Sequence, residues 1–318
     1  MTVAPSTQRA IAALAGDAIA VGPEGRLPTN LEYQQSLRVG AGTVQQAVRI
    51  LEGSDALEIA AKGHQGRHVV RRDVGALWAI ARFPPVRFVL PPPGSIELYG
   101  LIEGLGDHFA SLRVPFTGSH RRGGRGRLAL IAADAADATV VSCAAAEGLA
   151  GETGTALESR DLGHDTYYAP GTVVVLRGSG RRRRPEETRV GIDRASFDHV
   201  RLTEAEFPPE RGHRYVECDF PSMPVAVLEG RVDVGIWHRA ILLIPPQLAG
   251  LKVEPLRESA SIETRRALSS AVALFSTRRP EVAAVCRALD GGAVRRHQER
   301  LLTLDPRDPE LTERYWLR

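Results

Sequence analysis

Apolar positions between residues 26 and 70 first recur at helical spacing and then alternate along the chain. Helical spacing covers 31–37 and 43–52, and the turn RVGAG separates the two segments. The stretch LEIAAKGHQGRHVV, residues 57–70, alternates instead, with KGHQG as the tip of a hairpin. A helix, a short turn, a second helix and a hairpin in this order predict a winged helix-turn-helix, with any other small α+β subdomain as the alternative.

The pattern changes after residue 73. The segment 74–85 ends in two prolines, and we interpret it as an interdomain linker. From residue 86 onward, short apolar strands such as VRFVLP, DATVVS and RVGID alternate with helical segments, which is typical of an α/β domain with a largely parallel sheet. We therefore predict a winged helix-turn-helix head over residues 1–73, a linker over 74–85 and an α/β domain over 86–318.

Composition narrows the class of protein. The 318 residues are 43% hydrophobic and 25% charged, which fits a soluble globular chain. No window approaches the roughly 20 apolar residues of a membrane span, and the N-terminus lacks the layout of an export signal, so we expect a cytoplasmic protein. The three cysteines, Cys143, Cys218 and Cys286, are far apart, which predicts neither a disulfide framework nor a zinc site. The net charge of +3 does not by itself argue for nucleic acid.

Motifs for catalysis or cofactor binding are missing from the sequence. No HExxH, P-loop or GxGxxG pattern occurs in a suitable context, and the nine histidines are scattered singly. Cys143 follows Ser142 directly, but no local signature of a nucleophile surrounds it. We therefore expect no metal, no cofactor and no enzymatic activity.

The head carries residues that resemble a known family. Its pattern of LPT at 27–29, VG at 39–40, TV at 43–44, LE at 51–52 and a wing at 63–70 resembles the DNA-binding head of the GntR superfamily. Nearly the whole chain is similar to the YhfZ family of transcriptional regulators, through the blocks GLIEGL, SHRRGG, DATVVS, LGHDTYY, RVGID and EGRVDVGIW. The resemblance implies a winged helix fused to a two-lobed domain like a type 2 periplasmic binding protein.

A family of this kind implies a regulator that binds operator DNA as a homodimer and responds to a small-molecule effector. A dimer is expected because two-fold heads bind paired half-sites about one helical turn apart. Two alternatives remain: a solute-binding protein that does not bind DNA, and an enzyme built on the same two-lobed fold. The head argues against both, and a transport protein would also need an export signal.

The candidate DNA contacts lie at the ends of the two predicted helices and in the wing. Heads of the GntR type carry an arginine at the position of Ala41, and arginine bonds guanine bidentately. Glutamines can read adenine, so base contacts remain available. Residues 1–73 contain eight Arg and Lys against seven Asp and Glu, so the head has little excess charge for phosphates. The candidates are Thr29, Arg38, Gly40, Gly42, Thr43, Gln45, Gln46, His64, Gln65, Gly66 and Arg67.

A ligand of a two-lobed domain lies between the lobes, where loops at the carboxyl ends of strands and helix N-termini surround it. The loop PPPGSIELYG offers Ser95, which could equally be a plain helix cap. The loop GSHRRGGRGR offers His120, Arg122 and the Gly123 amide, with a solvated basic loop as the alternative.

Further candidates come from other strand ends. The loop VGIDRASFDH offers Asp193 at a strand end and Ser196 at a helix start, and Ser142 ends the strand DATVVS. Tyr167 lies in a crossover segment, and Trp237 could line the cleft or pack in the core. Because several of these groups are donors at helix starts and one loop adds an arginine, we predict a small anionic effector that carries a carboxylate or phosphate.

Overall fold

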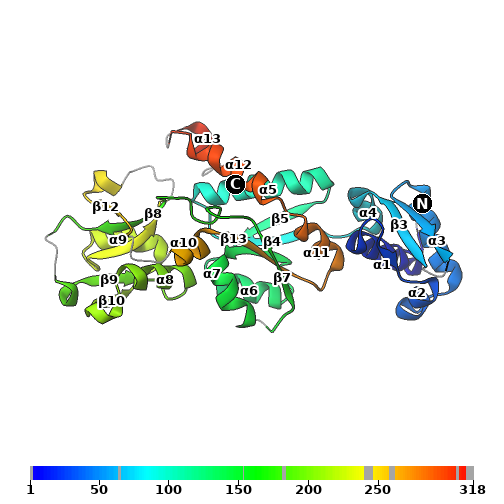
Figure 1. Cartoon of the computed structure of the whole chain (residues 1–318), viewed down its shortest axis with the longest axis horizontal. Helices are drawn as coiled ribbons and strands as arrows, with labels where there is room; N and C mark the ends of the chain where they lie inside the picture. The colour runs from blue at the N-terminus through cyan, green and yellow to red at the C-terminus, as the bar shows by residue number, and fades with distance from the viewer. Residues whose placement is uncertain are drawn as a thin grey trace.

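The computed structural model describes residues 3–63, 66–152, 154–180, 184–239, 246–257, 262–305 and 308–312. Three parts follow one another along the longest axis: a small head and two α/β lobes (Figure 1). Within these described ranges, no helix is long and apolar enough to cross a membrane.

In the head, the structure confirms the predicted helix-turn-helix and hairpin. Its helix α2 starts with a capping box, in which the Thr29 hydroxyl accepts from the Glu32 amide at 3.2 Å and the Glu32 carboxylate accepts from the Thr29 amide at 2.6 Å. Three antiparallel strands form the wing in the order β1-β3-β2. The elements are α1 (Pro5–Val21), β1 (Arg26–Leu27), α2 (Asn30–Leu37), α3 (Ala41–Gly53), β2 (Leu57–Ala61) and β3 (Arg67–Arg72).

The head packs against the first lobe through α1, which the sequence pattern did not reveal. The segment interpreted as a linker begins with a further helix, α4 (Val74–Ala81), and the Gln8 side chain of α1 donates to the carbonyls of Ile80 and Ala81 at 3.1 Å each. Trp78 of α4 is buried, and the Arg279 guanidinium of lobe 1 lies 5.9 Å from its ring centroid. One apolar cluster therefore runs from the head into lobe 1, so the junction is packed.

Lobe 1 surrounds a five-stranded sheet of order β5-β4-β6-β13-β7. Its helices cover the sheet because their apolar faces supply buried residues to the same clusters as the strands. Its elements are β4 (Val86–Leu90), α5 (Ile96–Leu112), β5 (Phe116–His120), α6 (Gly124–Ala132), β6 (Ala138–Ser142), α7 (Cys143–Leu149), the 3-10 turn η2 (Ala150–Glu152), β7 (Leu157–Asp161), β13 (Ala271–Ser276), α11 (Pro280–Arg287), α12 (Gly291–Leu302) and α13 (Pro309–Thr312).

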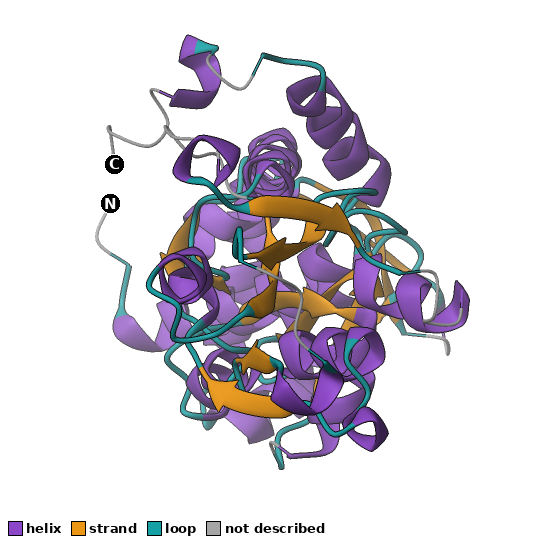
Figure 2. Cartoon of the chain, turned by 90° about the vertical axis from the view of Figure 1, so that its left-hand side faces the viewer, coloured by secondary structure: helices purple, strands orange, loops and turns teal. Residues whose placement is uncertain are grey.

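Lobe 2 surrounds a second five-stranded sheet, of order β10-β9-β11-β8-β12. Figure 2, viewed from the lobe 2 end, shows helices on both sides of the strands. Its elements are β8 (Val173–Arg177), η3 (Pro185–Glu187), β9 (Arg189–Ile192), α8 (Phe197–Glu206), η4 (Pro209–Arg211), β10 (Arg214–Glu217), η5 (Phe220–Ser222), α9 (Met223–Leu228), β11 (Val234–His238), η6 (Pro246–Ala249) and β12 (Lys252–Pro255), after which α10 (Ile262–Ser269) leads back to lobe 1.

Both sheets are mixed, so the prediction of a largely parallel sheet was wrong. In each lobe the first three strands of the sheet order pair in parallel, and the last two pairings are antiparallel. The strands β8 and β13 cause the difference, because each enters its sheet after the chain has crossed from the other lobe. A local alternation of strands and helices cannot reveal such a crossing.

The two lobes repeat one local arrangement at the start of a central strand. Asp137, just before β6, accepts from the Arg87 amide at 2.8 Å and from its Nε at 3.2 Å. Asp233, just before β11, accepts from the Arg189 amide and Nε at the same two distances. These carboxylates therefore hold equivalent strand ends in the two lobes.

Candidate functional site

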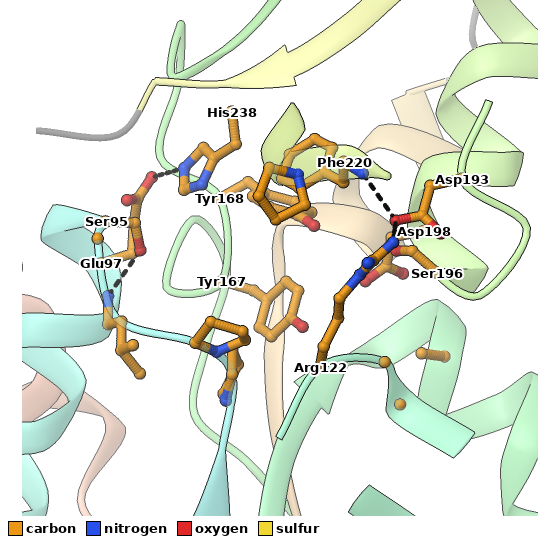
Figure 3. A pocket seen from close by; sticks show the side chains of 18 of the residues that line it. Ser95, Glu97, Arg122, Tyr167, Tyr168, Asp193, Ser196, Asp198, Phe220 and His238 are labelled. Atoms are coloured by element: carbon orange, nitrogen blue, oxygen red, sulfur yellow. Dashed lines mark hydrogen bonds and ion pairs between the residues drawn. The ribbon is translucent and has the colours of Figure 1, made fainter. Parts of the chain in front are cut away.

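A cavity of about 360 Å³ lies between the two lobes, a size that suits a small metabolite (Figure 3). Two predicted residues do not line it. The His120 ring hydrogen bonds to the Pro91 carbonyl at 2.6 Å, and Ser142 is fully buried and donates to the carboxylate of Asp198, which does line the cavity. The structure brings seven of the predicted residues to the wall: Ser95, Arg122, Gly123, Tyr167, Asp193, Ser196 and Trp237.

Two serines begin equivalent helices at the cavity. The Ser95 hydroxyl accepts from the Leu98 amide at 3.1 Å at the start of α5, and the Ser196 hydroxyl accepts from the His199 amide at 3.3 Å at the start of α8. Both side chains therefore serve as helix caps. The positive ends of both helices point toward the same space.

Arg122 reaches from lobe 1 to two carboxylates of lobe 2. Its guanidinium contacts Asp193 and lies 2.7 Å from Asp219. Asp193 is only 1% exposed and also accepts from the amides of Ala195 and Phe220, at 3.0 and 2.9 Å. Arg122, which we expected to bind the anionic effector, is thus paired with carboxylates across the cleft (Figure 3). Of its guanidinium nitrogens, Nε is buried without a partner among the described residues.

A second arginine of the same loop region, Arg127, was missed by the sequence analysis. It is 3% exposed on α6, lines the cavity, and hydrogen bonds only to neutral acceptors in the described structure. These are the Thr139 hydroxyl at 3.1 Å, the carbonyls of Arg121 and Val140 at 3.2 and 3.3 Å, and the Tyr167 hydroxyl at 3.4 Å. Its helical register with Leu128 and Ile131, which are buried on the same helix, was the available signal.

Asp198 is a buried acid beside this arginine. Burial raises the pKa of Asp198 to about 6, although the hydrogen bond from Ser142 and the charge of Arg127 oppose the shift. The Ser142 hydroxyl also accepts from the Ala145 amide at 3.0 Å. Ser142 therefore links the start of α7 to the cavity wall.

The opposite side of the cavity carries a buried pair that the sequence analysis also missed (Figure 3). Glu97 is 2% exposed, and its Oε1 accepts from the Ala169 amide at 2.8 Å, the Thr172 hydroxyl at 2.7 Å and His238 Nε2 at 3.0 Å. Burial acts to raise the pKa of Glu97, but His238 and the other donors outweigh it and lower that pKa. The other oxygen, Oε2, is buried without a hydrogen-bond partner in the described part of the chain.

Aromatic rings form much of the remaining wall. Tyr167 and Tyr168 pack edge to face with centroids 4.9 Å apart, and Tyr168 lies 5.0 Å from the His238 ring. Trp237, the next residue to His238, is 5% exposed and belongs both to the core of lobe 2 and to the cavity wall. Trp237 therefore both packs in the core and lines the cleft, the two roles that the sequence offered as alternatives.

Cys143 shows no sign of an activated nucleophile. Burial raises the pKa of its thiol, and the hydrogen bond to Glu147 raises it further. A reactive cysteine needs the opposite shift, because the thiolate is the nucleophile.

In the head, α3 presents a polar face. Gln45, Gln46 and Arg49 are exposed, whereas Val44 and Ala47 are buried against the head core. Arg49 is an additional cation on this face that the sequence analysis did not single out.

Other predicted contacts surround this helix. Arg38 and Gly40 are exposed just before it, and its first turn holds Gly42, which is exposed, and Thr43, which is half-buried. Thr29 is exposed and caps α2. Gly66 has a φ of +87°, Arg67 donates to the Pro28 carbonyl at 3.3 Å, and His64 and Gln65 lie outside the described residues.

Comparison with known proteins gives matches to both parts of the chain. Residues 73–310 match the family of the YhfZ C-terminal domain, and residues 24–69 match a helix-turn-helix domain family. The uncharacterized protein YhfZ of Escherichia coli (strain K12) is 27% identical over 281 residues, which cover 87% of this chain and 89% of that protein.

Solved structures include similar folds. The crystal structure of YhfZ from Shigella flexneri gives a TM-score of 0.55 at 26% identity and covers 72% of this chain and 94% of that one. The alkanesulfonate-binding protein SsuA from Xanthomonas axonopodis pv. citri, bound to MOPS, gives a TM-score of 0.48 at 16% identity and covers 72% of this chain and 82% of that one.

Proposed function

The chain belongs to the YhfZ family, and on that premise we propose that it is a DNA-binding transcription regulator controlled by a small anionic metabolite. A helix-turn-helix head joined to a two-lobed α/β domain supports a ligand-responsive regulator. In this proposal residues 1–73 bind operator DNA, residues 74–85 form a packed junction, and residues 86–318 bind the effector. The protein acts in the cytoplasm as a homodimer, because paired half-sites require two heads.

The exposed face of α3 supports the proposed DNA contact. A recognition helix enters the major groove, and its polar side chains then meet base edges. Gln45 and Gln46 would read adenine, and Arg49 would contact a base or a phosphate. The turn before α3 would place Arg38 and Gly40 against the DNA backbone.

The anionic effector rests chiefly on one observation: Arg127 is a buried guanidinium in the cavity wall whose described hydrogen-bond partners are all neutral. Asp198 lies close enough to interact with this charge, but no carboxylate of the described residues is hydrogen bonded to the guanidinium, so a carboxylate or phosphate that reached it would form a charge-assisted bond. The starts of α5 and α8 add favourable dipoles. Arg122 would then join the lobes around the ligand through Asp193 and Asp219.

The packed junction suggests how the signal reaches the DNA. Because α1 and α4 share an apolar cluster with lobe 1, the head and lobe 1 would move as one body. Lobe 2 would then be the part that shifts when a ligand binds, through the contacts that Arg122 and Ser142 make across the cleft. A shift of lobe 2 would change how two copies associate and hence the spacing of their heads.

A gel-shift assay on DNA from the chain's own promoter region, with and without metabolites, tests the function. We expect binding of the parent chain to change in the presence of at least one anionic metabolite that also raises its melting temperature. Arg127→Met should retain DNA binding and lose the response. Failure of the parent to bind this DNA, or binding that no stabilising metabolite changes, would contradict the proposal.

A further inference from the structure

The cavity wall carries an uneven distribution of charge. Arg122 is paired with Asp193, and Arg127 lies close enough to Asp198 for its charge to lower the pKa of that acid. Glu97 differs from both other carboxylates of the wall, because its ion-pair partner in the described residues is an imidazole rather than an arginine or lysine. The Glu97 side of the cavity therefore offers a ligand a carboxylate that no arginine or lysine of the described residues pairs with.

The hydrogen bonds of Glu97 are also uneven. All three described donors, from Ala169, Thr172 and His238, are bonded to Oε1. Oε2 is buried and accepts none within the described chain. A carboxylate oxygen accepts two or more hydrogen bonds when its capacity is filled, and an unfilled buried acceptor costs free energy. The lining position of Glu97 makes the cavity the place from which a donor could come.

The surroundings of this oxygen fit a cationic donor. Because a carboxylate can only accept, His238 Nε2 donates to Oε1, so Oε2 is the oxygen left for a donor from a ligand. Aromatic residues are only 5% of the chain, yet Tyr167, Tyr168 and Trp237 line this cavity. Aromatic faces attract cations such as ammonium groups.

We infer that the effector carries a protonated amine, bound by Glu97 Oε2, in addition to the anionic group that Arg127 holds. This inference rests on the proposed function and narrows its ligand to a zwitterionic or amine-bearing anionic metabolite. The two charged groups of such a ligand would each meet a buried opposite charge of the wall. A ligand with only one of them would leave either Arg127 or Glu97 without a charged ligand group to bind.

Matched pairs of compounds test this inference on the full chain. Calorimetry would compare glutamate with glutarate and glucosamine 6-phosphate with glucose 6-phosphate, because each pair differs in the amine. We expect at least one pair to bind with the amine-bearing member about tenfold to a hundredfold tighter, the effect of one charge-assisted bond in a desolvated site. This comparison uses the parent chain and does not depend on the folding of any variant.

Glu97→Gln then assigns the preference to Glu97. The amide keeps an acceptor for Ala169, Thr172 and His238 but replaces Oε2 with a donor, so the preference for the amine should disappear because the amine-bearing member binds more weakly. Asp107→Asn is the matched control, because it removes one negative charge from an exposed position on the same helix and should leave the preference unchanged.

The outcomes distinguish a failure of this inference from a failure of the proposed function. If the parent binds the amine-free members as tightly as the amine-bearing ones, or if Glu97→Gln keeps the preference, the inference is wrong and the anionic effector stands. If none of the four compounds binds and no other anionic metabolite raises the melting temperature, the proposed effector function fails together with the inference.

Discussion

The Arg122 guanidinium of lobe 1 contacts the Asp193 carboxylate of lobe 2 across the cavity. Asp193 is 1% exposed, whereas the Arg122 side chain is 35% exposed, so a half-exposed arginine pairs with a buried carboxylate between the lobes. Removing the arginine would leave a buried carboxylate with only amide donors. The contact therefore contributes both to the arrangement of the two lobes and to the free energy of unfolding.

Arg122→Ala should lower the free energy of unfolding by roughly 1.5–3 kcal/mol, the cost of losing a hydrogen bond to a buried charge. Urea unfolding followed by circular dichroism measures the change. Arg125→Ala is the control, because Arg125 belongs to the same loop region but forms an exposed pair with Glu152 inside lobe 1. If both variants lose the same stability, the contact with Asp193 is no stronger than a surface ion pair.

Gly123→Ala should disturb the close contact between the two lobes at this glycine. Gly123 has a φ of +77°, and an added Cβ would lie 3.0 Å from the Ala195 carbonyl oxygen of lobe 2. We expect a loss of roughly 1 kcal/mol or more, because the backbone strain and the contact act together. The melting temperature and the radius of gyration from small-angle scattering report the two effects. Gly118→Ala, whose added Cβ would meet Leu90 at an ordinary 4.0 Å, should change neither; equal effects at both positions would contradict the close approach.

Asp198 predicts a dependence of stability on pH. Its folded pKa of about 6 lies above the ordinary 3.8, so the unfolded chain releases the proton first as pH rises. Stability from this residue is therefore fully present below pH 4 and is lost between about pH 4 and 6, by about 2–3 kcal/mol. Asp198→Asn should remove this loss and become more stable relative to the parent as pH rises through that range.

Urea unfolding between pH 4 and 8 measures the difference, and Asp107→Asn serves as a control because its carboxylate is exposed. A difference between Asp198→Asn and the parent that is constant across this range would mean that Asp198 titrates normally. The Ser142 hydrogen bond is retained in the amide, so its loss does not complicate the comparison.

Ala41→Arg should strengthen DNA binding. Ala41 is exposed at the start of α3, where a new guanidinium would reach the groove that Gln45 faces. One guanine contact is worth about 1–3 kcal/mol where the site offers that base. Fluorescence anisotropy on a set of duplexes measures the gain, and Ala129→Arg, at an exposed position of α6 in lobe 1, controls for added charge. No gain on any duplex relative to the control would place α3 away from the groove.

The sequence was sufficient to predict those parts of the site and of the fold that depend on residues close together along the chain. Ser95 and Ser196 follow strands and begin helices, and the structure places both at the cavity because each lies at the carboxyl edge of the parallel strands of its own sheet. The head could be predicted for a similar reason, since its two helices and hairpin lie within one short segment. In each case the signal and the contact are close together along the chain.

The remaining residues depend on contacts that span the chain. Glu97 and His238 are 141 positions apart and meet only because the chain crosses between lobes, which also produced the mixed sheets. Arg127 was hidden among neighbouring arginines, because composition does not show which side chain a helix turns inward. The packed junction was missed because α1 buries its apolar residues against both the head and lobe 1.

The most direct test of this account is an anisotropy titration of the full chain onto DNA from its own promoter region, with and without a metabolite that stabilises the protein. We predict that the metabolite changes the apparent Kd at least about fivefold, the lower range of allosteric coupling, and that Arg127→Met abolishes the change while binding the DNA equally well without metabolite. An unchanged Kd at saturating metabolite, or an equal response in Arg127→Met, would contradict a regulator controlled through the interlobe cavity.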